Sequence, residues 1–476
     1  MRIAMVASES NPYIKTGGLA DVIGALSEEL ASKGHDVRVF LPFYSAIAER
    51  LDPNLTRLGG YTVHLSWRQQ DAFVAETEYR GVKFYFIGND YYFFRGGGIY
   101  GFDDDGERFA FFSLAVRDAF RFLDWKPDIV HVHDWQPGML PVLIKEQNAY
   151  DPFYNSIKFV LTIHNPEFKG MIDRYFLNNF YGLNDEIFDN GNVRFHGQVS
   201  TLKSAIVYCD KITTVSPTHR EELLSPEGSR GLSGVLQYRE KDFVGIVNGV
   251  DTIEWDPSDD PLLDRHYTAS SFEEGKARCK AGFLSGYGIQ GENRPMFGIV
   301  SRLTDQKGIQ LVLEVAPHIF ERGGILAILG SGQYEYHMAF ERLRSEHPDS
   351  CAIYIGYNNA LAHKIYAASD FFLMPSLFEP CGIGQMIAER YGALPIVRAT
   401  GGLADTVVSV EEEGRNGVVF RDFDANALRW AVDKAFDAYQ DKALRKEMIR
   451  NAMNADHSWC KSAESYLRLY EDCLER

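Results

Sequence analysis

Gly17-Gly18-Leu19-Ala20-Asp21, near the start of the chain, is repeated as Gly401-Gly402-Leu403-Ala404-Asp405 near its end. Each copy follows a strand-like apolar run and opens a helical stretch, and a threonine, Thr16 or Thr400, stands directly before the glycines. The equivalent placement of the two copies predicts two nucleotide-fold units, one in each half of the sequence.

Short runs rich in Val, Ile and Phe recur along the whole sequence, and most are uninterrupted, as in strands that are covered on both faces of a parallel sheet. Between them, apolar residues recur at helical spacing in stretches 20–32, 108–122, 309–320 and 428–439. This alternation predicts a doubly wound α/β fold. The expected strands are 2–8, 36–41, 128–133, 158–164, 211–216, 245–250, 296–301, 325–330, 351–356, 370–375 and 394–398.

An open twisted sheet rarely exceeds about 10 strands, fewer than the runs in this sequence, so two sheets are expected. The Asp- and Pro-rich stretch 248–260 marks the best seam between them. We therefore expect Rossmann-like domains at 1–247 and 248–476. Ligands of such sheets bind at the carboxyl ends of the strands, so a cleft between the two domains is the expected site.

The composition excludes several classes of partner. Lys and Arg total 49 against 66 Asp and Glu, which gives a net charge of −17. Such acidity argues against a general nucleic-acid binder and against a protein that docks on anionic membranes. No apolar run approaches the ~18 residues of a membrane span. The 6 cysteines are scattered, which indicates reduced thiols in a cytoplasmic protein and excludes a zinc site on paired cysteines.

Basic residues follow two of the expected strands. Lys15 precedes Gly17 and Gly18, where small residues and a helix N-terminus let an anion approach the backbone. Arg302 and Lys307 combine a planar guanidinium fork with a compact ammonium charge, a combination that suits a diphosphate. The alternative for all three cations is a solvated surface position.

The stretch Phe378-Glu379-Pro380-Cys381-Gly382-Ile383-Gly384-Gln385 also follows a strand and leads into a helix. A carboxylate repels phosphate, so Glu379 is expected to accept hydrogen bonds from sugar hydroxyls; the alternative is a helix cap. Cys381 is disfavoured as a nucleophile because no histidine lies near it in sequence.

Histidines occur at the ends of two strands in the first half, beside Asp134 and Asn165. We expect His131 and His133 to point to opposite faces of their strand, which argues against a shared metal. Together with His164 they either line a polar, sugar-sized site or belong to the core. The aromatic stretch 85–100 is likewise either core packing or a stacking surface for a sugar polymer.

Together these motifs resemble the bacterial glycogen synthases, close kin of plant starch synthases, and they occur in family order along essentially the whole chain. The most specific are Lys15-Thr16-Gly17-Gly18-Leu19-Ala20-Asp21-Val22 and Phe378-Glu379-Pro380-Cys381-Gly382. The supporting ones are His133-Asp134-Trp135, Thr162-Ile163-His164-Asn165, Asn248-Gly249-Val250-Asp251, Ser301-Arg302-Leu303 with Lys307-Gly308, and Thr400-Gly401-Gly402-Leu403.

The resemblance implies a GT-B fold of two facing Rossmann-like domains, with the last helix, about 460–476, packing back on the first. It implies transfer of glucose from ADP-glucose to the non-reducing 4-hydroxyl end of an α-1,4-glucan such as glycogen, with retention at the anomeric carbon. No metal and no cofactor are implied. The alternatives are a UDP-glucose-using synthase, a nucleotide-sugar epimerase of the same fold, or a glucan-binding protein without activity.

The resemblance also implies roles for individual residues. Diphosphate contacts are expected from Lys15, Arg302 and Lys307, and glucose contacts from Glu379. The residues expected to act in catalysis are Glu379, Arg302, Lys307 and His164. Those expected to bind substrates are Lys15, Gly17, Gly18, Asp21, Asp134, Asn248, Tyr357, Cys381, Gly382, Ile383 and Gly384, with Tyr357 against the base.

Two features depart from family patterns. Ile383 and Gly384 stand where many relatives have Leu and Thr, so a threonine hydroxyl near the phosphates is absent. Other retaining GT-B families often carry a second glutamate eight residues after the first, but Ile387 occupies that position here. Glu389, two residues further on, is therefore given no catalytic role.

Overall fold

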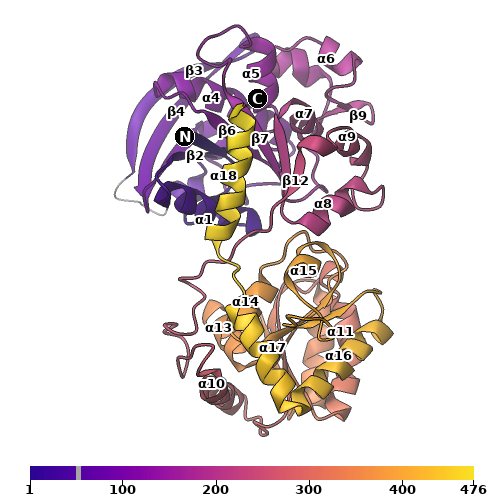
Figure 1. Ribbon diagram of the computed structural model, residues 1–476. Helices are drawn as coiled ribbons and strands as arrows, with labels where there is room; N and C mark the ends of the chain where they lie inside the picture. Colours follow the sequence, from indigo (N-terminus) through magenta and orange to yellow (C-terminus); the bar gives the residue numbers. More distant parts are fainter. Residues whose placement is uncertain (50–54, 476) are drawn as a thin grey trace. The chain divides into compact units, whose positions relative to one another are not determined.

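A computed structural model of the chain describes residues 1–49 and 55–475 (Figure 1). The chain divides into two compact units. Unit 1 comprises Met1–Ile246 and Trp459–Arg476, and unit 2 comprises Val247–Ser458. The prediction of a doubly wound α/β fold is confirmed. In the part of the chain that is described, no helix is both long and apolar enough to cross a membrane.

Unit 1 contains a nine-stranded sheet in the order β12-β11-β7-β6-β1-β2-β5-β4-β3. The pairings from β12 through to β5 are parallel, whereas β5–β4 and β4–β3 are antiparallel. The strands are β1 (Arg2–Val6), β2 (Asp36–Pro42), β3 (Thr56–Leu65), β4 (Arg68–Tyr79), β5 (Val82–Gly88), β6 (Ile129–His133), β7 (Lys158–Ile163), β11 (Lys211–Thr214) and β12 (Phe243–Gly245). A small sheet adds β8 (Met171–Ile172), β9 (Arg194–Phe195) and β10 (Gln198–Ser200).

Helices cover the sheet of unit 1. They are α1 (Gly18–Ser32), α2 (Ser45–Ala48), α3 (Asp90–Phe93), α4 (Asp105–Phe122), α5 (Leu140–Gln147), α6 (Glu186–Asp189), α7 (Thr201–Tyr208), α8 (Pro217–Leu224), α9 (Ser233–Tyr238) and α18 (Trp459–Glu475). A π-helical turn lies at Leu177–Tyr181 and a 3₁₀ turn at Glu240–Asp242.

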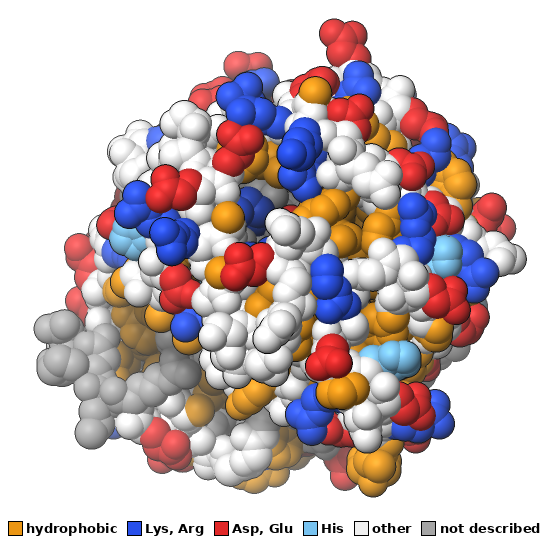
Figure 2. Space-filling model, turned by 90° about the horizontal axis from the view of Figure 1, so that it is seen from below, with side chains coloured by type: hydrophobic (Ala, Val, Ile, Leu, Met, Phe, Trp, Pro, Cys, Tyr) orange, Lys and Arg blue, Asp and Glu red, His pale blue; other side chains and the backbone are white. Residues whose placement is uncertain are grey.

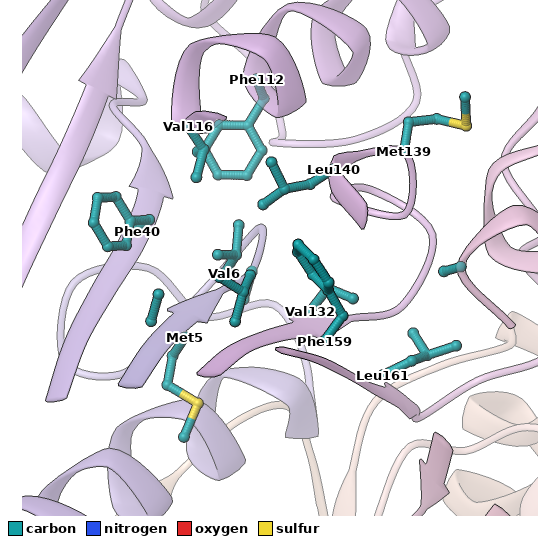
Figure 3. Packing of buried hydrophobic residues seen from close by; sticks show 14 of the residues in the cluster. Met5, Val6, Phe40, Phe112, Val116, Val132, Met139, Leu140, Phe159 and Leu161 are labelled. Atoms are coloured by element: carbon teal, nitrogen blue, oxygen red, sulfur yellow. The ribbon is translucent and has the colours of Figure 1, made fainter. Parts of the chain in front are cut away.

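The core of unit 1 forms where helices pack on the parallel strands. Figure 3 shows Val6 of β1 and Val132 of β6 near Phe112 of α4 and Leu140 of α5. These side chains are fully buried. Truncating a buried phenylalanine such as Phe112 to alanine typically costs about 3–5 kcal/mol, so this packing fixes the strands firmly.

The C-terminal helix α18 belongs to unit 1, where it runs beside α1 (Figure 1). Its apolar residues recur every three or four positions and are buried, among them Trp459, Tyr466 and Tyr470. The Tyr470 hydroxyl lies 2.8 Å from Nδ1 of His131, in the middle of the sheet. Arg476, the last residue of the helix as expected from the sequence, lies outside the described residues.

Unit 2 contains a six-stranded, fully parallel sheet in the order β15-β14-β13-β16-β17-β18. The direction of chain progression reverses between β13 and β16, which is where doubly wound sheets bind ligands. The strands are β13 (Met296–Val300), β14 (Ile325–Gly330), β15 (Cys351–Ile355), β16 (Phe371–Met374), β17 (Leu394–Arg398) and β18 (Val418–Phe420). The helices are α10 (Phe272–Gly286), α11 (Ile309–Glu321), α12 (Tyr334–Glu346), α13 (Asn359–Ala368), α14 (Gly384–Arg390), α15 (Gly401–Thr406), α16 (Ala425–Gln440) and α17 (Lys442–Asn454), with a 3₁₀ turn at Asp305–Lys307.

The expected strand at 245–250 is wrong. Strand β12 ends at Gly245, and the apolar run that follows carries the chain out of unit 1. Val250 instead donates its backbone N–H to the carbonyl of His457 at 2.8 Å. The two places where the chain passes between units are therefore joined by backbone bonding within unit 2.

Candidate functional site

A buried carboxylate holds the loop that follows β1 in unit 1. Glu9 is 3% exposed and accepts hydrogen bonds from the backbone N–H and the hydroxyl of Thr16, at 2.5 and 2.8 Å. Burial raises the pKa of Glu9, while the bonds from Thr16 oppose that shift. Sequence reasoning missed this residue, although a glutamate directly after a buried strand is an unusual feature.

The loop presents the lysine and the paired glycines predicted from the sequence. Lys15 is exposed, and its Nζ lies 2.7 Å from Oδ1 of Asp21. Gly17 caps α1 without a side-chain hydrogen bond, so N–H groups of the first turn remain available. A Cβ on Gly18 would meet nothing within 4 Å. The arrangement brings a cation, an open backbone and the start of a long helix together.

Asp134 and His164 lie at the ends of the neighbouring strands β6 and β7. Asp134 adopts a left-handed conformation (φ 58°), and its Oδ1 accepts the backbone N–H groups of His164 and Asn165 at 2.7 and 3.3 Å. Burial raises the pKa of Asp134 to about 7, so the carboxyl is partly protonated near neutral pH. Burial lowers the pKa of His164 to about 3, which keeps the imidazole uncharged.

The expectation that His131 and His133 face opposite sides of their strand is wrong. Side chains two residues apart on a strand share a face, and these two rings lie with their centroids 4.0 Å apart and their planes tilted by 33°. His131 bonds Thr162 at 2.6 Å, and His133 Nδ1 lies 3.0 Å from Nε2 of His164. Burial lowers the pKa of both strand histidines, so they are neutral core groups. Within residues 1–49 and 55–475, no cluster of three or more His, Cys, Asp or Glu side chains is arranged to hold a metal.

The aromatic stretch 85–100 belongs mainly to the core. Tyr85, Tyr92 and Phe93 are at most 2% exposed, while Tyr91 is 63% exposed. The Tyr100 hydroxyl bonds that of Ser8 at 2.6 Å, close to the loop that Glu9 holds. Most of these rings are therefore packing residues rather than a sugar-stacking surface.

In unit 2, the loops after β13 and β16 meet at the switch point of the sheet. Lys307 Nζ lies 2.6 Å from Oε2 of Glu379, and the Ser376 hydroxyl donates to the same oxygen at 3.0 Å. Glu379 is 7% exposed. The N-cap of α14 is Ile383, without a side-chain hydrogen bond, so the helix-cap alternative for Glu379 is wrong.

Backbone bonding ties these two loops together. Gln306 accepts the backbone N–H of Leu377 at 2.8 Å and donates its side-chain amide to the carbonyl of Phe378 at 3.2 Å. Arg302 is exposed, with a guanidinium nitrogen 3.4 Å from Oε1 of Gln306. Arg302, Lys307 and Glu379 therefore come from one interlocked pair of loops.

The second copy of the repeated motif packs against the same loop. A Cβ on Gly401 would overlap the carbonyl oxygen of Glu379, and one on Gly402 would overlap that of Cys381. Gly402 donates its N–H to the carbonyl of Pro380 at 3.1 Å. Gly382 itself has φ 73°, a conformation that favours glycine. The loop is thus held closely from one side.

The remaining predicted residues of unit 2 differ in exposure. Cys381 is buried, and burial raises the pKa of its thiol to about 12, which leaves it protonated and a poor nucleophile. The backbone of Asn248 hydrogen-bonds this thiol. The buried Oδ1 of Asn248 has no hydrogen-bond partner among the residues that the structure describes. Tyr357 is 88% exposed and able to stack on a flat ligand.

The position of the missing threonine is enclosed. A Cβ on Gly384 would lie 3.3 Å from Sδ of Met374 and 3.4 Å from the hydroxyl of Tyr366. Position 384 therefore contributes backbone groups to the loop but no side-chain hydroxyl.

On the molecular face in Figure 2, Lys and Arg are interspersed with Asp and Glu, and no basic field covers that face.

Comparisons with known proteins agree with this architecture. The family model of the starch synthase catalytic domain matches residues 2–238, and that of glycosyl transferases group 1 matches residues 289–455. A glycogen synthase of Clostridium perfringens is 44% identical and covers 100% of this chain and 99% of the relative. One of Anoxybacillus flavithermus is 41% identical, over 100% and 98%.

Solved structures include similar proteins. The catalytic domain of starch synthase IV from Arabidopsis thaliana, bound to ADP and acarbose, has a TM-score of 0.89 and 32% identity, over 100% of this chain and 99% of that chain. A sucrose-phosphate synthase from Thermosynechococcus elongatus has a TM-score of 0.63 at 16% identity, over 100% of both chains, and shares the fold alone.

Proposed function

The chain belongs to the glycogen synthase and starch synthase family of GT-B glycosyltransferases, and from that premise we propose that it transfers glucose from ADP-glucose to the non-reducing 4-hydroxyl of an α-1,4-glucan. We assign the donor to unit 2 and the glucan acceptor to unit 1. A cytoplasmic location fits the six free cysteines. The starch synthase that binds ADP and acarbose supports both substrate assignments.

The observation that carries the proposal is the pairing of Lys307 with Glu379 at the switch point of unit 2. A nucleotide sugar presents a diphosphate and sugar hydroxyls a few bonds apart. The two loops place an ammonium group, which suits the diphosphate, directly beside a carboxylate, which suits the hydroxyls. Arg302, exposed on the same pair of loops, supplies a second cation.

Bond cleavage creates charge on the leaving diphosphate. As the bond between the anomeric carbon and the phosphate oxygen breaks, negative charge grows on that oxygen, and Arg302, Lys307 and Lys15 stabilise it in our proposal. A preorganised donor of this kind contributes about 3–4 kcal/mol to the transition state. The backbone around Gly382, Ile383 and Gly384 is proposed to lie against the donor, and Tyr357 to stack on the base.

The sugar side of the reaction needs polar groups that do not oppose the positive charge developing on the glucose ring. Neutral His164 is able to hydrogen-bond a sugar hydroxyl without repelling the positive charge that develops on the glucose ring. Asp134, Asp21 and Asn248 are proposed to bind hydroxyls of glucose or of the acceptor. Gly17 and Gly18 leave room for a ligand against the backbone.

Retention is proposed to occur by attack from the face that the diphosphate leaves. The acceptor 4-oxygen bonds the anomeric carbon as the phosphate oxygen departs, and that oxygen takes the proton of the acceptor hydroxyl, which gives ADP and a lengthened glucan. Glu379, the carboxylate that we assign to the donor sugar in unit 2, is already bonded to Lys307 and Ser376, which does not favour it as a nucleophile. Detection of a glucosyl-enzyme by mass spectrometry of the quenched reaction would contradict this mechanism.

Turnover with matched donors tests the proposal. Purified protein is incubated with glycogen and either ADP-glucose or UDP-glucose, and nucleotide release and chain growth are measured together. We expect faster growth with ADP-glucose. Faster growth with UDP-glucose would replace the donor assignment, and conversion of the sugar nucleotide without chain growth would identify an epimerase.

A further inference from the structure

A chain of buried hydrogen bonds runs through unit 2 from the point where the polypeptide leaves it. His457, two residues before Trp459, has its Nε2 2.5 Å from Oε2 of Glu389. The other carboxylate oxygen of Glu389 accepts the side-chain amide of Asn416 at 3.1 Å. Glu389 is completely buried, although no ligand contact was assigned to it.

The chain of bonds continues to the loop that carries Glu379. The Asn416 amide also donates to the backbone carbonyl of Thr406 at 3.2 Å. The Thr406 hydroxyl accepts the side-chain amide of Gln385 at 3.1 Å. That same amide donates to the carbonyls of Cys381 and Gly382 at 3.2 and 3.1 Å, and Gln385 is completely buried.

These last bonds determine how the loop presents its backbone. A peptide group is planar, so a carbonyl held in one direction turns the N–H of the next residue the opposite way. Gln385 holds the carbonyls of Cys381 and Gly382, and it thereby orients the N–H groups of Gly382 and Ile383. These amides belong to the loop that we propose binds the donor.

A buried polar network of this kind is an unfavourable way to fill space, if packing is its only role. Burial of a carboxylate costs several kcal/mol unless partners compensate it, and apolar side chains of the same volume often fill such a space with equal or greater stability. Asn416 and Thr406 are 4% and 7% exposed, so the network extends through the interior. Hydrogen bonds are directional, however, so the bonds that Asn416 and Gln385 donate fix geometry more narrowly than apolar packing does.

We propose that Glu389 is a positioning residue for glucosyl transfer, which acts through Asn416, Thr406 and Gln385 on the Glu379–Gly384 loop. This inference rests on the proposed function, because it assigns that loop to donor binding. Glu389 is completely buried and reaches the loop only through these three residues, so in this proposal it does not contact the substrate. Its effect is therefore expected on donor parameters and not on acceptor affinity.

The first test compares Glu389→Ala with the conservative Glu389→Gln, which keeps an oxygen for Asn416. For Glu389→Ala we expect kcat/KM for ADP-glucose to fall about tenfold while KM for glycogen stays within about twofold, because a loosened loop misplaces the donor. Glu389→Gln should recover most of that loss. A merely structural role would lower the melting temperature and the active fraction without this split between substrates.

The second test needs no substrate and uses Thr406→Val, which removes the hydroxyl and keeps the shape. The backbone N–H of Gly402 donates to the carbonyls of Glu379 and Pro380, so its hydrogen exchange reports on loop attachment. We expect this amide to exchange about tenfold faster in Thr406→Val and in Glu389→Ala, with amides of β14 unchanged. Thr406→Val also keeps the question answerable if Glu389→Ala does not fold.

The outcomes separate this inference from the proposed function. If wild-type protein transfers no glucose from ADP-glucose, the proposed function fails, while the exchange experiment still reads the network. If donor kinetics and Gly402 exchange in both Glu389→Ala and Thr406→Val equal those of the wild type, the positioning role is overturned. It is equally overturned if Glu389→Gln is as defective as Glu389→Ala.

Discussion

The two copies of Gly-Gly-Leu-Ala-Asp have the same sequence and opposite surroundings. At the first copy, a Cβ on Gly18 would meet nothing within 4 Å, and a Cβ on Gly17 would come no closer than 3.9 Å to Glu9. At the second copy, the carbonyl oxygens of Glu379 and Cys381 occupy the space that a Cβ on Gly401 or Gly402 would need. The first copy leaves open space at the N-terminus of α1. In the second copy, the absence of side chains lets the Glu379–Gly384 loop pack directly against the backbone.

The carboxyl groups near the two copies also differ, in their hydrogen-bond and ion-pair partners. In unit 2, Glu379 is paired with Lys307 and bonded by Ser376. In unit 1, Glu9 and Asp134 are buried near each other, and each carboxyl has a raised pKa because burial is not fully compensated. The carboxylate in unit 2 is thus paired with a cation, whereas the two carboxyls in unit 1 are held by backbone N–H and hydroxyl donors.

The largest expected effect comes from removing the paired carboxylate. Glu379→Ala should lower kcat about a thousandfold while the fold persists, because sugar hydroxyls and Lys307 both lose their partner. Steady-state kinetics with ADP-glucose and a thermal melt measure the two consequences. Glu314→Ala, exposed on α11, is the matched control and should keep wild-type turnover. Wild-type rates in Glu379→Ala would remove Glu379 from the site.

The unpaired carboxyl of unit 1 should show itself in the pH dependence of stability. The folded pKa of Asp134 is raised to about 7, so its stability contribution is complete below the unfolded pKa and is lost as pH rises through about 7. Asp134→Asn keeps an oxygen for the two backbone N–H groups and does not titrate. Its stability relative to the wild type should therefore rise by about 2–3 kcal/mol between pH 5 and 8.

Urea unfolding of both proteins at several pH values measures this difference. Titrating groups that do not interact with Asp134 cancel in the comparison, and the neighbouring Glu9, a minor cause of the raised pKa of Asp134, adds only a smaller change. A difference that does not change with pH would show that Asp134 is already ionised at pH 5, and the contrast between the two carboxylates would then disappear.

Adding one methyl group to the second copy should destabilise unit 2. Gly402→Ala forces a Cβ into the carbonyl of Cys381, and overpacking of this kind costs about 1–3 kcal/mol. Because the displaced loop carries Glu379, kcat/KM for ADP-glucose should fall with stability. Chemical denaturation together with donor kinetics is the measurement, and wild-type behaviour in both would show that the loop is not held by this copy.

The same methyl group in the first copy should have the smallest effect on stability. Gly18→Ala adds a Cβ in open space at the first position of α1, so unfolding should change by less than about 0.5 kcal/mol. If a ligand lies against this backbone, as we propose, activity should fall nonetheless. Unchanged stability with unchanged activity would make Gly18 a plain helix start.

Much of the fold was predictable because its strands are buried on both faces. The expected runs 325–330 and 394–398 agree with β14 and β17 to the residue. The antiparallel pair β3 and β4 was missed, since β3 is mostly exposed and carries Gly59 and Gly60, which do not read as a strand. The run 245–250 misled because its apolar residues serve the passage between units.

Candidate site residues could be proposed from the sequence only where they belong to a local motif. Arg302, Lys307 and Glu379 belong to motifs in the loops that follow β13 and β16, and Lys15 belongs to a motif in the loop between β1 and α1. Gln385 and Glu389 act through partners distant in sequence, Thr406 and Asn416, and the sequence gives no sign of those pairings. The role of Glu9 depends likewise on its hydrogen bond with Thr16, seven residues further along the chain.

The stoichiometry of the reaction tests the central claim most directly. Purified protein is given ADP-glucose and a short α-1,4-glucan, and ADP released is counted against glucose added at the non-reducing end. Our account predicts equal amounts of the two, with an α-1,4 linkage in the product. ADP-glucose that is isomerised or left intact while the glucan keeps its length would contradict it.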